Sequence, residues 1–156
     1  MGHYPEENSE FIREFFKRTL HNLNTYVEDH QNNKERYPYD VTQTINSFMG
    51  LIVFLKDSDI VFSQELETFV VDHPPSQWFC NNANNGSEEH NFKNYLKRLR
   101  NAVSHRQINS IPDENDDIVA LQFRDGYNGG CFEAKLPIES VNLLIKLLSQ
   151  NILGAN

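Results

Sequence analysis

The chain has 156 residues, a length that fits one domain spanning residues 1–156 and suffices for a hydrophobic core without disulfide staples. Apolar residues make up 38% of the sequence, which excludes a fully disordered chain. The net charge of −8 argues against broad, non-specific binding to nucleic acid, because such binding depends on an excess of Lys and Arg that neutralises phosphates.

Apolar side chains recur at three- and four-residue spacing in four long segments, which predicts helices over 8–30, 40–56, 88–105 and 137–152. The second of these helices is apolar on most sides, so we expect it to be buried centrally or covered by a partner subunit. The region between the second and third helices is the hardest to interpret. A short helix over 66–71, ended by two prolines, is the most that its pattern indicates.

A β-hairpin is predicted between the third and the last long helix. Residues 107–116 are polar and contain a proline, so we interpret them as a loop. Residues 118–123 and 131–136 alternate between apolar and polar side chains as strands do, and Asp125-Gly126 is typical of a turn. A lone hairpin is marginal in water, so it should pack on the helices. The predicted fold is mainly α, a four- to five-helix bundle with a β-hairpin before the last helix.

No segment is expected to cross a membrane, because the longest apolar stretch, within 49–55, falls far short of the roughly 18 residues that would raise the question. The polar, acidic N-terminus is unlike a signal peptide. Two isolated cysteines, Cys80 and Cys131, make neither a zinc set nor a disulfide framework, and a single bridge between them is the alternative. We therefore expect a reduced, cytoplasmic protein without a metal or other cofactor.

Basic side chains are concentrated in the third long helix. Five of the fourteen Lys and Arg residues lie between Lys93 and Arg106, with no acidic residue among them. Such a strip on an acidic body indicates a local anion site. We interpret Lys93, Lys97 and Arg98 as a solvated face rather than as dedicated phosphate contacts, although such a face can still steer a polyanion.

Arg100, Asn101 and His105 form the most informative pattern in the chain. With about 100° per residue, Arg100 and His105 lie roughly 140° apart on a regular helix, so one helix cannot easily aim both at the same atom. Two solutions are open. Either the helix ends near Val103 and His105 turns back, or two copies of the helix meet and pool their residues.

These residue types suit attack of an RNA 2′-hydroxyl on its own phosphodiester. His105 can transfer protons near neutral pH, and the planar guanidinium of Arg100 can donate to the phosphate oxygens as negative charge develops on them. Asn101 can orient the histidine or hold a phosphate oxygen, and Ser104 can do the same more weakly. The steps need no metal. The alternative is a pair of solvated residues at a helix end, where a cation is stabilising in any case.

Residues 100–105, Arg-Asn-Ala-Val-Ser-His, resemble the Arg-polar-x-x-x-His signature of HEPN ribonucleases. Residues 11–23 and 41–51 are similar to a small bacterial HEPN family that has plasmid-borne members, and 57–90 resemble it least. The resemblance implies a helical bundle, a homodimer with the motif at the shared face, and a role in toxin–antitoxin or phage-defence systems.

Two functions follow. The first is a metal-independent endoribonuclease with His105 as acid and base, Arg100 as stabiliser of the phosphorane and Asn101 as orienter. The substrate contacts expected beside them are Lys97, Ser104 and Arg106. Its partners would be RNA, a second copy of the chain and an antitoxin or regulatory protein. The second function is a non-catalytic HEPN module that binds a nucleotide or a protein partner. The acidic net charge favours the second, and the intact motif favours the first.

Overall fold

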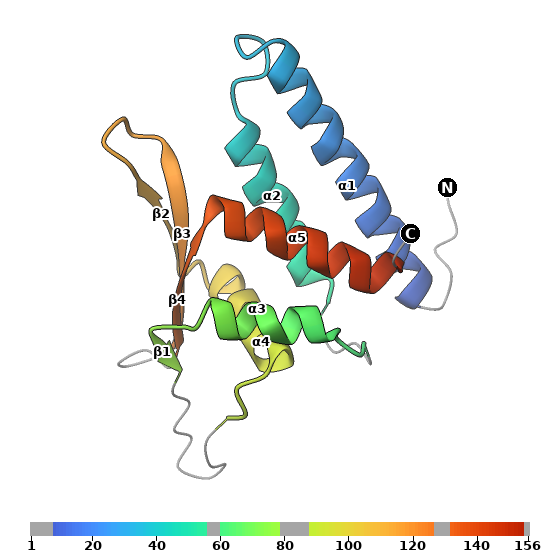
Figure 1. Cartoon of the computed structure of the whole chain (residues 1–156), viewed down its shortest axis with the longest axis vertical. Helices are drawn as coiled ribbons and strands as arrows, with labels where there is room; N and C mark the ends of the chain where they lie inside the picture. The colour runs from blue at the N-terminus through green and yellow to red at the C-terminus, as the bar shows by residue number, and fades with distance from the viewer. Residues whose placement is uncertain (1–7, 56–59, 79–87, 127–131, 155–156) are drawn as a thin grey trace.

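The computed structural model describes residues 8–55, 60–78, 88–126 and 132–154, and within these ranges it contains five helices and a four-stranded antiparallel sheet (Figure 1). In chain order the elements are α1 (Asn8–Asn32), α2 (Asp40–Val53), α3 (Gln64–Asp72), β1 (Gln77–Trp78), α4 (Phe92–Ser104), β2 (Ile108–Pro112), β3 (Ile118–Asp125), β4 (Phe132–Pro137) and α5 (Ile138–Leu153). The fold is mainly α, as predicted, but its sheet is larger than the expected hairpin.

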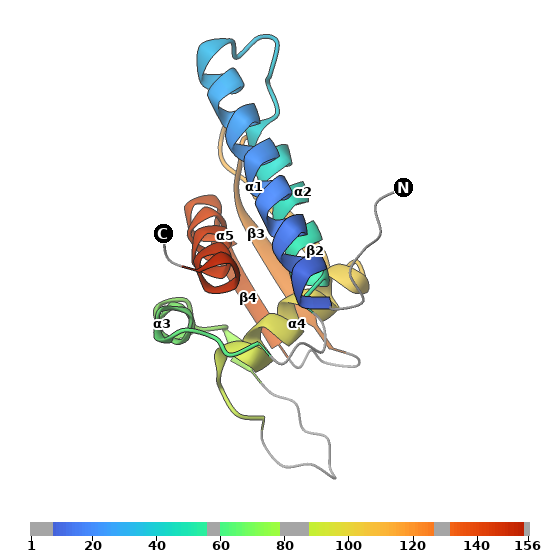
Figure 2. The same cartoon turned by 90° about the vertical axis from the view of Figure 1, so that its right-hand side faces the viewer.

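The two N-terminal helices lie side by side and support the rest of the fold (Figures 1 and 2). α2 is central, since it contacts α1 on one side and α4 and α5 on others. Phe48, Leu51 and Ile52 of α2 are fully buried, because the helix is covered on several sides. Its C-terminal end is open, where Val53 and the following Phe54 are exposed, and Thr42 and Asn46 also face solvent. The central position predicted for this helix is confirmed within the chain itself.

The last helix, α5, packs across α1, α2 and α3 and also covers the sheet. Its buried stripe includes Val141, Leu144 and Leu148, which recur at helical spacing. At its C-terminal end, the guanidinium of Arg13 in α1 donates to the carbonyl oxygen of Ile152 at 2.6 Å. A cation at this position satisfies a carbonyl that has no partner within the helix, so α1 caps α5.

The sheet has the strand order β1-β4-β3-β2 and carries α4 and α5 on one face. β3 and β4 pair as the predicted hairpin, with Phe123 opposite Ala134. Leu121 and Phe123 point inward and are buried, whereas Arg124 and Lys135 are exposed on the other face. The hydrophobic core therefore lies between the helices and one face of the sheet.

The prediction of a loop over 107–116 was wrong, because Ile108–Pro112 forms β2, paired antiparallel with β3. β2 is an edge strand, and both Asn109 and Ser110 are exposed, so its sequence lacks the alternation that marks a strand. Backbone hydrogen bonds to β3, rather than buried side chains, define this strand.

None of the described helices is both long and apolar enough to cross a lipid bilayer. The two cysteines, Cys80 and Cys131, lie outside the described residues.

Candidate active site

The helix that carries the motif, α4, begins at Phe92 rather than at residue 88 as predicted. Asn91 is its N-cap, and the side-chain oxygen of Asn91 accepts a hydrogen bond from the backbone N–H of Asn94 at 2.9 Å. One face of the helix is buried against α2, α3 and β3, and includes Tyr95 and Leu99. This buried face orients the helix, so the motif residues occupy its partly exposed side.

The C-terminal end of α4 is a Schellman motif. Ser104 is the last helical residue and His105 is the C-cap. The N–H of Arg106 donates to the carbonyl oxygen of Val103 at 3.1 Å, and that of Gln107 to Ala102 at 2.7 Å. Arg106 has a φ of 58°, in the left-handed region where helices that end this way usually carry glycine. The backbone beside His105 is thus held in a defined turn.

Arg100 lies within α4, and His105 is the C-cap residue that follows its last turn. The N–H of His105 donates to the carbonyl oxygen of Asn101 at 2.9 Å, so the last turn of the helix is continuous. The helix ends at Ser104, one residue beyond Val103, and regular helix geometry up to that point separates positions 100 and 105 by roughly 140° around the axis. The end of the helix near Val103, which the first of the two solutions requires, is therefore present, and the choice between the two solutions stays a prediction.

Most of the other expected site residues are open to solvent. Lys97, Ser104 and Arg106 are exposed, and Arg100 is half-buried. Lys97 precedes Arg100 by about one helical turn and Ser104 follows it by about one, so these three form a stripe. Within the described chain, the charged groups of Lys97, Arg100 and Arg106 have no ion pair. These cations are available to an anionic ligand.

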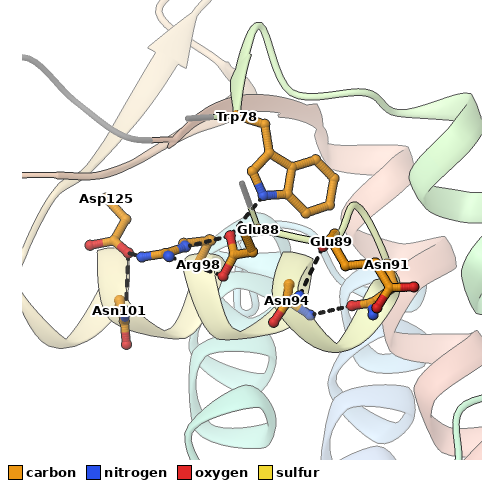
Figure 3. A network of polar contacts seen from close by, with 8 residues as sticks. All are labelled: Trp78, Glu88, Glu89, Asn91, Asn94, Arg98, Asn101 and Asp125. Atoms are coloured by element: carbon orange, nitrogen blue, oxygen red, sulfur yellow. Dashed lines mark hydrogen bonds and ion pairs between the residues drawn. The ribbon is translucent and has the colours of Figure 1, made fainter. Parts of the chain in front are cut away.

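A buried polar network reaches the motif from beneath (Figure 3). The side-chain amide of Asn101 donates from Nδ2 to Oδ2 of Asp125 at 3.1 Å. The same carboxylate oxygen accepts from Nη1 of Arg98 at 2.9 Å. Arg98 also donates to Glu88 through Nε and Nη2, both at 3.0 Å, and Glu88 accepts from Nε1 of Trp78 at 2.9 Å. Five side chains from α4, the sheet and the segment before α4 are thereby joined.

The interpretation of Arg98 as part of a solvated face was wrong. Its side chain is only 14% exposed, and those of Glu88 and Asp125 are 13% and 6% exposed. The planar guanidinium donates to Glu88 through two nitrogens and to Asp125 through the third, a bidentate geometry that a lysine ammonium does not provide. Arg98 therefore neutralises buried acids and does not contribute to the exposed basic strip. That strip consists of Lys93, Lys97, Arg100 and Arg106.

Comparison with known protein families assigns the chain to a family. The family model described as HEPN pEK499 p136 matches residues 1–155. The chain belongs to this HEPN family. No curated protein and no solved structure matches it. The match confirms the resemblance seen in the motif and in residues 11–23 and 41–51, and it also spans 57–90, where the resemblance was weakest.

In this HEPN protein Trp78 packs beside the network and anchors the chain there. Its ring is stacked on His90 at 4.2 Å and meets Tyr95 and Phe132 edge-on. The hydroxyl of Tyr95 donates to the carbonyl oxygen of His73 at 3.1 Å, and burial raises the pKa of Tyr95 well above its usual range. Trp78 thus packs against α4, and Tyr95, which belongs to α4, connects this helix to the residue that follows α3.

Sequence reasoning missed Arg98, Glu88 and Asp125 as neighbours of the motif. One signal was present, because Asp125 continues the inward alternation of Leu121 and Phe123 along β3. A carboxylate at such a position needs a partner, and a basic residue on the helix packed against the strand is the natural candidate. The Asp125-Gly126 pair is typical of a turn, and that interpretation concealed the signal.

Proposed function

We propose that this HEPN protein is a metal-independent endoribonuclease that cleaves RNA by attack of a 2′-hydroxyl on the adjoining phosphodiester. The observation that carries the proposal is the presentation of the motif. Arg100 is half-buried within α4, His105 is exposed at the C-cap of that helix, and the side chain of Asn101 between them is anchored by Asp125. Membership of a HEPN family supports it, since HEPN proteins are often ribonucleases.

The reaction proceeds by transfer of protons through histidine. A neutral His105 ring accepts the proton of the 2′-hydroxyl while the 2′-oxygen bonds to phosphorus. The bond to the 5′-oxygen breaks, and that oxygen receives a proton from a protonated histidine. The products are a 2′,3′-cyclic phosphate and a 5′-hydroxyl. Arg100 donates to the non-bridging oxygens, where negative charge accumulates in the transition state.

A homodimer completes the site in this proposal. Because Arg100 and His105 diverge by roughly 140°, a single helix does not direct both at one phosphate. A two-fold axis near Asn101 would set both copies of Arg100 and His105 around one cleft, in an isologous interface. The dimer would also bring two exposed strips together, which explains how a chain of net charge −8 can attract RNA.

The function is tested by incubating purified protein with RNA in EDTA beside three variants. His105→Ala is expected to lower the cleavage rate about 10²- to 10⁴-fold, as loss of an acid–base group does. Arg100→Ala is expected to lower it about 10²- to 10³-fold, as loss of a transition-state donor does. Lys135→Ala removes an exposed cation from the outer face of the sheet and should leave the rate unchanged. Intact RNA in the presence of a bound mononucleotide would favour the non-catalytic module instead.

The homodimer is tested by complementation. Arg100→Ala and His105→Ala chains are refolded together and assayed, and partial recovery of cleavage is expected, since a mixed dimer draws Arg100 from one chain and His105 from the other. Each variant refolded alone is the control. A protein that sediments as a monomer at micromolar concentration while still cutting RNA would contradict the shared site.

We further propose that the ribonuclease serves as a toxin or phage-defence effector held in check by an antitoxin or regulatory protein. Expression without such a partner should then slow growth. Plasmids recovered from surviving cells should carry substitutions at Arg100 or His105. Survivors with an unaltered coding sequence and full expression would count against this role.

A further inference from the structure

The buried network holds the side chain of Asn101, a residue of the motif. Its Nδ2 donates to Oδ2 of Asp125, and Asp125 is almost fully buried. A carboxylate accepts hydrogen bonds and cannot donate them, so the amide must present its N–H to Asp125. The carbonyl oxygen Oδ1 of Asn101 consequently points away from Asp125.

The orientation of Asn101 is set by a different element from the one that carries it. Asp125 ends β3, which is held between β2 and β4, and Arg98 donates to the same Oδ2 atom at 2.9 Å. Asp125 is therefore itself held on two sides. His105 follows Asn101 by four residues, a spacing that places the two side chains on the same side of a helix.

We propose that Asp125 is a positioning residue for the motif, and that Arg98 positions Asp125 in turn. This inference rests on the proposed function. Asp125 holds the Asn101 amide so that Oδ1 accepts the N–H of one ring nitrogen of His105. The other ring nitrogen is then unprotonated and accepts the proton of the RNA 2′-hydroxyl. Asp125 at the end of β3 therefore determines the tautomer of His105, because it orients the Asn101 amide.

Two alanine variants separate positioning from structural support. Asp125→Ala and Glu88→Ala each leave Arg98 with one carboxylate, but among the described residues the Glu88 side chain bonds to Trp78 and Arg98 and to no motif residue. Both should lower the melting temperature. Asp125→Ala alone should lower kcat about 10- to 100-fold, because small misplacements of a catalytic group have effects of this size, with KM unchanged. An equal loss of kcat in Glu88→Ala would overturn the proposal.

A conservative variant and a double-mutant cycle sharpen the test. In Asp125→Asn a single amide oxygen can still accept from both Arg98 and Asn101, so most of kcat should return. In an Asn101→Ala background, Asp125→Ala should lower kcat no further, because its effect passes through Asn101. Full additivity would overturn the proposal. If Asp125→Ala does not fold, Asp125→Ser, which is too short to reach Asn101, replaces it.

A spectroscopic measurement tests the contact without any activity. In ¹⁵N-labelled protein the side-chain amide resonances of Asn101 should shift in Asp125→Ala and stay in place in Glu88→Ala. Unchanged resonances in Asp125→Ala would overturn the positioning role. If the wild-type protein cuts no RNA, but the Asn101 resonances still shift in Asp125→Ala and not in Glu88→Ala, only the proposed function would be contradicted.

Discussion

Replacing Arg106 by glycine should stabilise the protein. Arg106 occupies the left-handed position of the turn that ends α4, with a φ of 58°. That conformation costs an L-residue roughly 1–2 kcal/mol. Glycine avoids this cost but loses about 0.4–1 kcal/mol through its greater freedom in the unfolded chain. The midpoints of these ranges predict a gain of about 0.8 kcal/mol in the free energy of unfolding, or about 2–3 °C in melting temperature for a chain of this size.

Thermal unfolding followed by calorimetry measures this gain, and Arg106→Ala is the matched control. Alanine removes the same guanidinium but keeps a Cβ atom, so it retains the strain and should not stabilise the protein. A gain of equal size in both variants would refute the reasoning, because it would trace the effect to the charge rather than to the backbone.

The same pair of variants tests whether Arg106, at a position where glycine is favoured, contributes to RNA binding. Strained positions of this kind often accompany function. Arg106 is exposed beside His105, so its side chain can bind a phosphate. If it does, Arg106→Gly and Arg106→Ala should weaken RNA binding equally while only one of them stabilises the fold. Unaltered RNA affinity in both would remove Arg106 from the substrate contacts.

Three further predictions concern the support of α4. Asn91→Ala should lower the free energy of unfolding by about 1 kcal/mol, measured in urea, because it removes the N-cap hydrogen bond. An unchanged free energy of unfolding would show that this cap does not stabilise the helix. Arg98→Met should lower it by about 3–5 kcal/mol, since Glu88 and Asp125 would remain buried without their cation, and a neutral result would show that they relax into water. Stability should fall as the pH rises above about 10, where Tyr95 ionises only in the unfolded chain; ultraviolet titration of native protein in which every tyrosine ionises normally would contradict this.

Helical periodicity was sufficient to predict the long helices, because each buries a single apolar stripe in the core. The second helix is the clearest case, since its nearly continuous apolar surface required a central position and α2 has one. β2 could not be predicted in the same way. An edge strand held by backbone hydrogen bonds leaves little trace in its side chains, and Asn109 and Ser110 both face solvent.

The motif could be located from the sequence, but its surroundings could not. Arg98 and Lys97 are adjacent and carry the same charge, yet only Arg98 is turned toward Asp125 on the strand beneath. A helical wheel does not reveal which polar side will meet a strand that lies 27 residues away in the chain. Local spacing therefore predicted a uniform basic strip, and tertiary packing divided it.

The identity of the nucleophile tests the central claim most directly. The cleavage site in a short RNA is first mapped in EDTA, and the nucleotide on its 5′ side is then replaced by its 2′-deoxy form. The account predicts that the all-ribose RNA is cut to a 2′,3′-cyclic phosphate and that the substituted RNA stays intact at that bond. Cleavage of the substituted bond, or products that end in a 3′-hydroxyl and a 5′-phosphate, would contradict it.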